Sequence, residues 1–178
     1  RDDDHGASAG ASTMMDRVGN EVNSAGIVER SGDVDVFAFT SGAGAVSFDV
    51  TTTRIASGTW GGNLDVRLEL RDATGNVLSS NNSSSNTNAS LTYSLPQSGS
   101  YFLYVSPVGL GDPINSTPSG YTQYGSLGQY SVSGTIIPTL NVAPVAVADT
   151  YDVQAGTSLN VSVSSGVLVN DTDNNGNE

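Results

Sequence analysis

The chain has 178 residues, carries a formal net charge of −12 and contains no cysteine, and all six of its basic residues are arginines. This charge excludes the basic surface that nucleic acids and anionic membranes require, and the absence of cysteine excludes disulfides, thiol catalysis and thiolate metal sites. Divalent cations are the partners that such acidity favours.

Short strands separated by turns follow a polar beginning. Residues 1–25 are predicted to be an acidic lead-in, with a weak helical signal over 14–22. Residues 79–88 are predicted to be a mobile polar loop, and 107–127 a long loop that is functional or mobile. Alternating apolar residues predict strands at 26–30, 33–40, 45–50, 64–71, 89–95, 99–106 and 128–136, with 72–78 forming a turn and a return strand that pairs with 64–71.

The segment 64–71 has the clearest alternation in the chain. Its apolar residues are expected to face the core, and its charged residues are expected to face solvent. The outward set comprises Asp65, Arg67, Glu69 and Arg71.

Closely spaced strands with little helix predict an all-β fold, an antiparallel β-sandwich of jelly-roll type, over residues 26–137. Residues 138–144, which begin and end with proline, are predicted to be a rigid linker. Residues 145–178 read as two or three strands that open a second β-domain, too few to stand as a sandwich.

No catalytic constellation is evident. The single histidine, His5, lies in a terminus expected to be flexible and solvated, and no HExxH, GxSxG or Walker motif occurs. The chain is therefore predicted not to be an enzyme.

Two aspartates raise a different possibility, because Asp33 and Asp35 share a strand face with Phe37 that should be dry. Buried carboxylates are costly without a cation or several donors, and calcium prefers carboxylate and carbonyl oxygens. The acidic run at 2–4 could supply further ligands. In the alternative reading the run is surface charge, Asp33 caps a turn and Asp35 is exposed at a sheet edge.

A second, weaker calcium candidate is the run Asp171, Asp173 and Asn175, followed by Gly176, which fits the start of a calcium loop. The alternative is a frayed polar end.

Four aromatic residues are candidates for contact with a polymer. Tyr104 faces the opposite side of its strand from Tyr101 and Leu103, and Tyr121 and Tyr124 lie in the long loop. Trp60 stands between glycines. These rings could stack on sugars or contact peptide, or Trp60 could instead close the end of the sandwich.

The stretches GIVERSGDVDVFAFT, GNLDVRLELRDATGNVL, GSYFLYV and YGSLGQYSVSG occur in this order over residues 26–136. Together they resemble the bacterial pre-peptidase C-terminal domain and, through it, the collagen-binding domain of collagenases. The DDHG of residues 3–6 looks like the junction after the catalytic domain of some secreted metallopeptidases. Residues 143–178 resemble the start of a cadherin-like bacterial repeat.

The resemblance implies a secreted, non-catalytic accessory domain, joined to an N-terminal peptidase domain of the same polypeptide. It implies calcium (Ca²⁺) where the lead-in meets the turn before the D-x-D-x-F strand, with Asp33 and Asp35 matching that turn and Asp3 and Asp4 matching the lead-in. It also implies contact with a polymeric protein or polysaccharide substrate. Tyr104 lies on a strand comparable to those that carry the collagen-binding tyrosines of the collagenase relatives. Two other readings are an adhesion or carbohydrate-binding module using Trp60 and 107–127, and a spacer that binds only ions.

Overall fold

The computed structural model describes residues 2–56, 59–60, 63–84, 86–114, 116–139 and 144–172, with the backbone alone at 54–56 and 59–60. Residues up to Pro138 form one compact unit and those from Thr139 form a second. No helix among the described residues is long and apolar enough to cross a membrane. The elements are η1 (Ala9–Ala11), β1 (Thr13–Met14), β2 (Asp16–Val18), β3 (Glu21–Val28), β4 (Asp35–Ser41), β5 (Gly44–Thr52), β6 (Arg54–Ala56), β7 (Thr59–Trp60), β8 (Asp65–Asp72), β9 (Val77–Asn82), β10 (Ala89–Leu95), β11 (Gly99–Val108), η2 (Gln123–Gly125), β12 (Gly128–Thr135) and η3 (Val163–Ser165).

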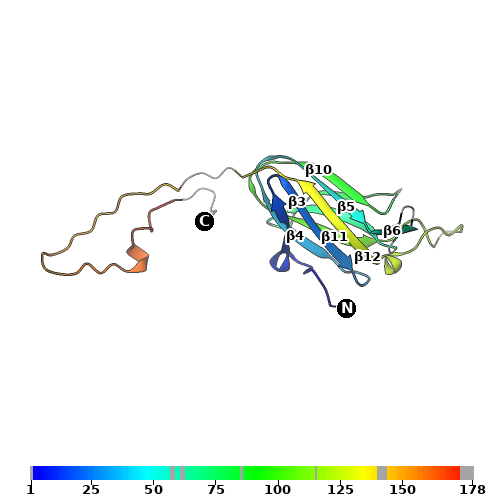
Figure 1. The fold of residues 1–178 in the computed structure, drawn as a ribbon, viewed down its shortest axis with the longest axis horizontal. Helices are drawn as coiled ribbons and strands as arrows, with labels where there is room; N and C mark the ends of the chain where they lie inside the picture. Colours follow the sequence, from blue (N-terminus) through cyan, green and yellow to red (C-terminus); the bar gives the residue numbers. More distant parts are fainter. Residues whose placement is uncertain are drawn as a thin grey trace. The chain divides into compact units, whose positions relative to one another are not determined.

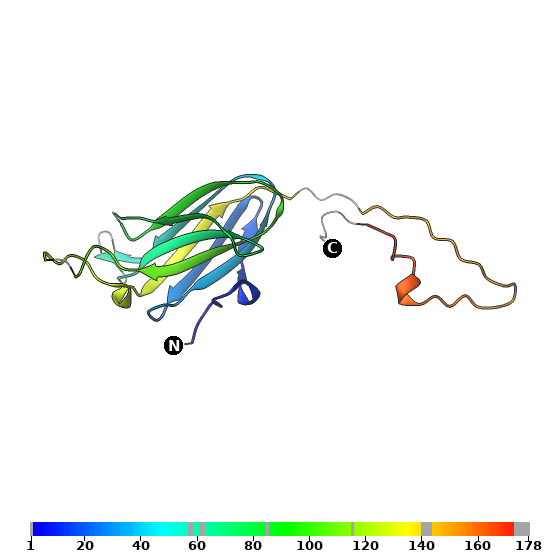
Figure 2. The same ribbon diagram turned by 180° about the vertical axis from the view of Figure 1, so that it is seen from behind.

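The first unit is a two-layered β-sandwich (Figures 1 and 2). One sheet has the strand order β1-β4-β11-β8-β9 and the other β10-β5-β12-β3-β2, while β6 and β7 form a separate hairpin. All strand pairs in these sheets are antiparallel except β1 with β4. The predicted all-β, antiparallel sandwich is confirmed.

The core lies between the two sheets and follows the predicted alternation. Phe37 and Phe39 of β4 face Phe48 of β5 across the sandwich, and Leu68 and Leu70 of β8 extend this apolar layer. Each of these five side chains is at most 2% exposed. Strand alternation therefore specifies which face of each sheet is dry.

The prediction that the charged residues of β8 are solvated is wrong at two positions. Asp65 is 1% exposed and Glu69 is 4% exposed. Both lie on the face opposite the core, but the Ser126 hydroxyl of the long loop bonds to the backbone of Asp65, and two arginines pair with Glu69. Alternation fixes the face of a side chain, and loops and neighbouring side chains fix its exposure.

The lead-in predicted over 1–25 includes strands β1 and β2 and the beginning of β3, so the sandwich starts earlier than residue 26. The weak helical signal over 14–22 is wrong. Val18 and Glu21 pair directly, and Gly19 adopts a φ of 64° in the intervening two-residue turn, a geometry that glycine permits at little cost. Met15 and Val22 gain more from the core than from an isolated helix, since they are 4% and 1% exposed.

The polar segment predicted as a loop over 79–88 begins as strand, because β9 runs to Asn82 and pairs with β8. The long segment after β11 is indeed a loop, closed by an isolated bridge between Leu110 and Tyr121 and followed by η2. At Gly120 a Cβ would lie 1.7 Å from the carbonyl oxygen of Leu110, so this closure requires glycine.

The second unit does not form the two or three predicted strands within its described part, residues 144–172. It contains η3 and an isolated bridge between Val145 and Thr172. Large apolar side chains remain open to solvent, with Val163 95% and Leu168 77% exposed. Strand-like sequence without partner strands has no sheet to join, because strand stability comes from cross-strand pairing and burial.

Candidate metal centre

The N-terminal segment is fixed to the sandwich by His5 and Gly6. His5 Nε2 donates to the carbonyl oxygen of Ala25 at 2.8 Å, and His5 Nδ1 lies 2.8 Å from Thr13 Oγ1. The ring packs edge-on against Phe37, with 4.7 Å between centroids, and the amide of Val36 donates to the Gly6 carbonyl. The prediction that His5 is flexible and solvated is therefore wrong, because both ring nitrogens have partners.

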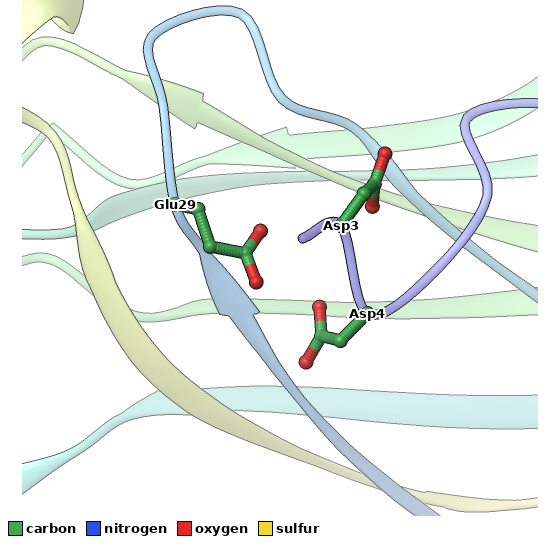
Figure 3. A group of neighbouring side chains, drawn as sticks. All are labelled: Asp3, Asp4 and Glu29. Atoms are coloured by element: carbon green, nitrogen blue, oxygen red, sulfur yellow. The ribbon is translucent and has the colours of Figure 1, made fainter. Parts of the chain in front are cut away.

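This docking brings five carboxylates together at one end of the sandwich. Asp3 and Asp4 come from the N-terminal segment, Glu29 follows β3, Asp33 lies in the next turn and Asp35 begins β4. One oxygen from each of Asp3, Asp4 and Glu29 lies within 4.8 Å of the other two, and the same holds for Asp3, Asp33 and Asp35 (Figure 3 shows the first group). Asp3 belongs to both groups.

Four carboxylate oxygens of this cluster are buried without a hydrogen-bond partner: Oε1 and Oε2 of Glu29, Oδ1 of Asp33 and Oδ1 of Asp35. The other oxygens of the two aspartates are satisfied. The Glu29 amide donates to Asp33 Oδ2 at 3.1 Å, and the Tyr130 hydroxyl donates to Asp35 Oδ2. Asp33 is 2% exposed and Asp35 is fully buried, so the reading of Asp35 as an exposed edge residue is excluded.

Positive charge at the cluster is sparse. The guanidinium of Arg30 lies 3.0 Å from Asp3 Oδ2 and 3.8 Å from Asp33 Oδ1, and the Arg30 side chain is 63% exposed. One exposed guanidinium does not balance five carboxylates, because solvent screens its charge.

The pKa values of two acids in this cluster are raised, mainly by burial and further by neighbouring carboxylates. Burial raises the pKa of Asp35 to about 7, and the charges of Asp33 and Asp4 act in the same direction, while the Tyr130 hydroxyl opposes them. Burial also raises the pKa of Glu29. The interaction with Asp33 and the negative charge of Asp4 raise it further. A divalent cation would oppose both shifts, because its charge favours the ionised carboxylates that burial disfavours.

The donor set suits calcium. Calcium takes six to eight oxygen ligands, many of them carboxylate, and tolerates irregular geometry. Among the described residues the cluster offers carboxylates alone, without the imidazole or thiolate donors that favour zinc. The orphaned buried oxygens therefore fit a hard cation.

Comparison with known proteins agrees with this architecture. Residues 33–107 match the bacterial pre-peptidase C-terminal domain. The predicted resemblance is thereby confirmed for this region, which contains Asp33, Asp35 and Tyr104. The likeness of 145–178 to a cadherin-like repeat stays a prediction.

The individual proteins that resemble this chain are either distant in sequence or similar over only part of their length. A probable subtilase-type serine protease of Deinococcus radiodurans is 41% identical over 75 residues, which is 42% of this chain and 10% of that protein. Among solved structures, the pre-peptidase C-terminal domain of a Bacillus anthracis collagenase has a TM-score of 0.45 and 16% identity, covering 70% of this chain and 94% of that one. The periplasmic lysozyme inhibitor PliG of Aeromonas hydrophila has a TM-score of 0.46 and 10% identity, covering 70% and 95%.

Sequence reasoning missed Glu29, Tyr130 and Gly26 as parts of the centre. Glu29 stands where β3 ends, four residues before Asp33. An acidic residue so close to Asp33 was the sequence feature that could have identified it as a candidate ligand. Tyr130 lies on β12, 95 residues from Asp35, so no local pattern connects the two. Gly26 leaves the space that the Tyr130 hydroxyl and Asp35 occupy.

The remaining predicted site residues lie elsewhere. Asp171 Oδ1 accepts a hydrogen bond from the Val147 amide at 2.9 Å, and Asp173 and Asn175 lie outside the described residues. The backbone of Trp60 pairs with Arg54 in the β6–β7 hairpin, and its side chain also lies outside the described part. Tyr104 sits on the outer face of β11 beneath the Arg71 guanidinium, whereas Tyr121 and the 82% exposed Tyr124 lie in the long loop.

Gly26→Ala is expected to lower the free energy of unfolding by about 1–3 kcal/mol, the usual cost of overpacking. The added Cβ would lie 2.3 Å from the Tyr130 hydroxyl and 3.0 Å from Asp35 Oδ2. Urea unfolding would measure the loss. Gly10→Ala is the control, because a Cβ there meets nothing within 4 Å. Equal stability of the two variants would contradict close packing around Gly26.

Proposed function

We propose that this chain is a non-catalytic, calcium-stabilised accessory domain of a secreted bacterial protease. The observation that carries the proposal is the set of four buried carboxylate oxygens without hydrogen-bond partners, held by Glu29, Asp33 and Asp35. The match of residues 33–107 to the pre-peptidase C-terminal domain, and the likeness to part of a probable subtilase-type protease, support the protease context.

Calcium would join the N-terminal segment to the sandwich. Asp3 and Asp4 lie on that segment, whereas Glu29, Asp33 and Asp35 lie on or beside strands of the sandwich. A cation that binds both sets stabilises the docked segment by its binding free energy. The segment would then leave the sandwich at a fixed place, which positions an N-terminal peptidase domain of the same polypeptide.

A non-catalytic role is consistent with the use of His5. Both of its ring nitrogens are engaged, with Thr13 and the Ala25 carbonyl. A general base needs a nitrogen within reach of the proton that it abstracts. Two classes of parent protease are compatible with this proposal. The DDHG stretch favours a metallopeptidase, and the similar Deinococcus radiodurans protein is a probable subtilase-type serine protease.

A calcium titration by calorimetry tests the proposal. We expect saturable binding, and Glu29→Gln should weaken it by about tenfold or more because carboxylate number sets calcium affinity. Glu21→Gln is the matched control, since Glu21 lies at the other end of the same strand, exposed and away from the cluster. Heat of binding that is unchanged by Glu29→Gln, or absent from the unmodified protein, would refute the calcium site.

A carbohydrate-binding or adhesive role is the second candidate. A hollow of about 540 Å³ is lined mostly by polar side chains from β5, the end of β9, the segment between β9 and β10, and the start of β10, including Asp49, Asn82 and Asn88. Amides and carboxylates of this kind hydrogen-bond sugar hydroxyls. Retention on insoluble chitin or cellulose that Asn82→Ala abolishes would favour this role over the accessory role.

A further inference from the structure

The outer face of the sheet β1-β4-β11-β8-β9 combines apolar side chains with arginines. The register places Met14, Ala38, Phe102, Arg71 and Val77 side by side in one row across all five strands. Met14 is 65% exposed and Val77 is 51% exposed at the two ends of this row. The row therefore offers apolar side chains on both sides of a guanidinium.

The neighbouring row carries the charge that orders this face. Glu69 lies between Arg67 and Arg71 on β8, and each arginine forms an ion pair with a different oxygen of Glu69. Glu69 is 4% exposed, whereas the side chains of Arg67 and Arg71 are 47% and 31% exposed. Glu69 thus pairs with both guanidiniums, while both arginine side chains stay partly exposed.

Tyr104 of β11 completes the arrangement. It pairs directly with Glu69, and the Arg71 guanidinium lies 4.2 Å from the centroid of its ring. Ion pairing on one side and the cation–π contact on another fix the orientation of Arg71. A guanidinium that is already ordered loses little entropy when it binds a ligand.

The opposite sheet provides an internal comparison. Its outward positions on β5, β10 and β12 are mostly hydroxyl residues, such as Thr51, Ser90 and Ser133. Arginine, tyrosine, phenylalanine and methionine are enriched at protein interfaces, and serine is depleted. The outer face of the sheet β1-β4-β11-β8-β9 is therefore closer to the composition of an interface than these three strands are.

We propose that this face, formed by Arg67, Arg71, Phe102, Tyr104 and the flanking Met14 and Val77, binds an extended polypeptide that carries carboxylate side chains. The inference deepens the proposed accessory function, on which it rests, by naming the class of substrate that the domain holds. A ligand carboxylate would accept hydrogen bonds from exposed N–H groups of Arg67 and Arg71, the two side chains that already pair with Glu69. The apolar ends of the row would contact side chains on either side of that carboxylate.

Charge complementarity selects this ligand over a basic one. The outward side chains of the five strands include four charged groups: Asp65, Arg67, Glu69 and Arg71. Asp65 is only 1% exposed, so it is not accessible to a ligand on this face. Both oxygens of Glu69 are already paired, so this face offers guanidinium N–H donors and no free carboxylate. The rest of the chain is strongly acidic, so the attraction is local and requires close contact at physiological salt.

Fluorescence anisotropy of a labelled (Glu-Pro)8 peptide, which is acidic and extended, tests the assignment with the full chain in calcium and 0.15 M salt. We expect binding at least about tenfold tighter than that of (Gln-Pro)8 or (Lys-Pro)8, since close charge pairs of opposite sign are favoured and like charges repelled. The triple variant Arg67→Gln/Glu69→Gln/Arg71→Gln should lose this binding, and it leaves no buried carboxylate unpaired. Arg17→Gln, an exposed arginine of β2 in the opposite sheet, should retain it.

Three results would overturn the proposal. The first is no preference for (Glu-Pro)8, and the second is equal binding by the triple variant, with its fold verified by thermal unfolding. The third is competition by polygalacturonate as effective as that of the peptide, which would assign the face to acidic polysaccharide. Calcium titration is independent of these results, so failure here is distinguishable from failure of the calcium-stabilised accessory role.

Discussion

Asp35→Asn is expected to stabilise the calcium-free protein and to remove most of the stabilisation that calcium provides. Without a cation, burial raises the pKa of Asp35 from 3.8 to about 7. A raised carboxyl pKa means that stability falls as pH rises from about 4 to about 7, because the folded state must then give up a proton that it binds more tightly. At pH 8 in chelator the variant should therefore be more stable by about 2–4 kcal/mol.

With calcium bound, the unmodified protein should become more stable than the Asp35→Asn variant. A site filled to 100 times its Kd adds roughly 2.7 kcal/mol to the unmodified protein, whereas the variant lacks one anionic ligand and should gain less than about 1 kcal/mol. The Asn oxygen can still accept from the Tyr130 hydroxyl, so the comparison isolates the charge. Thermal unfolding with calcium and with chelator at pH 8 measures both effects.

Asp49→Asn is the control for this comparison, because Asp49 is exposed on β5 and lies outside the cluster. It should change stability by less than about 0.5 kcal/mol in either condition. A variant Asp35→Asn that is less stable in chelator, or that keeps the full calcium response, would remove Asp35 from the proposed site.

Asp65→Asn is expected to stabilise the protein at neutral and alkaline pH and to have little effect near pH 4. Both carboxylate oxygens of Asp65 are buried without a hydrogen-bond partner, and the residue is 1% exposed. Burial raises its pKa from 3.8 to about 6, so its ionisation destabilises the fold progressively as pH rises through this interval. The variant should gain about 1–3 kcal/mol at pH 8.

Urea unfolding in excess calcium, repeated from pH 4 to pH 8, measures this difference. The backbone contacts to Ser126 remain in the variant, because they use the amide and carbonyl of Asp65. Asp49→Asn, at an exposed position of β5, is again the control. A constant difference between Asp65→Asn and the unmodified protein across the pH range would show that ionisation of Asp65 is not the cause.

Much of the sandwich was predictable because its strands alternate locally. The pattern of 64–71 and 33–40 assigned Leu68, Leu70, Phe37 and Phe39 to the core, and all four are buried. The signal failed over 14–22, where a two-residue hairpin and the core outweigh local preference. It also failed over residues 144–172, the described part of the second unit, where no strand forms.

The candidate metal centre was predictable only in part. Asp33 and Asp35 stood out because their strand face leads directly to Phe37. Glu29 and Tyr130 did not, since their contribution depends on how β3 and β12 are placed beside the turn and β4. His5 was misread because its partners, Thr13 and the Ala25 carbonyl, come together only when the N-terminal segment docks.

The sequence by itself determined that this protein is an acidic, cysteine-free β-protein with two inward-facing aspartates before a strand. These properties depend on composition and on a period of two, which each strand carries within a few residues. The tertiary structure alone decided which carboxylates meet, which oxygens lack a partner, and that Glu69 is enclosed by Arg67 and Arg71. Those outcomes depend on contacts between distant segments and on burial, which no local pattern records.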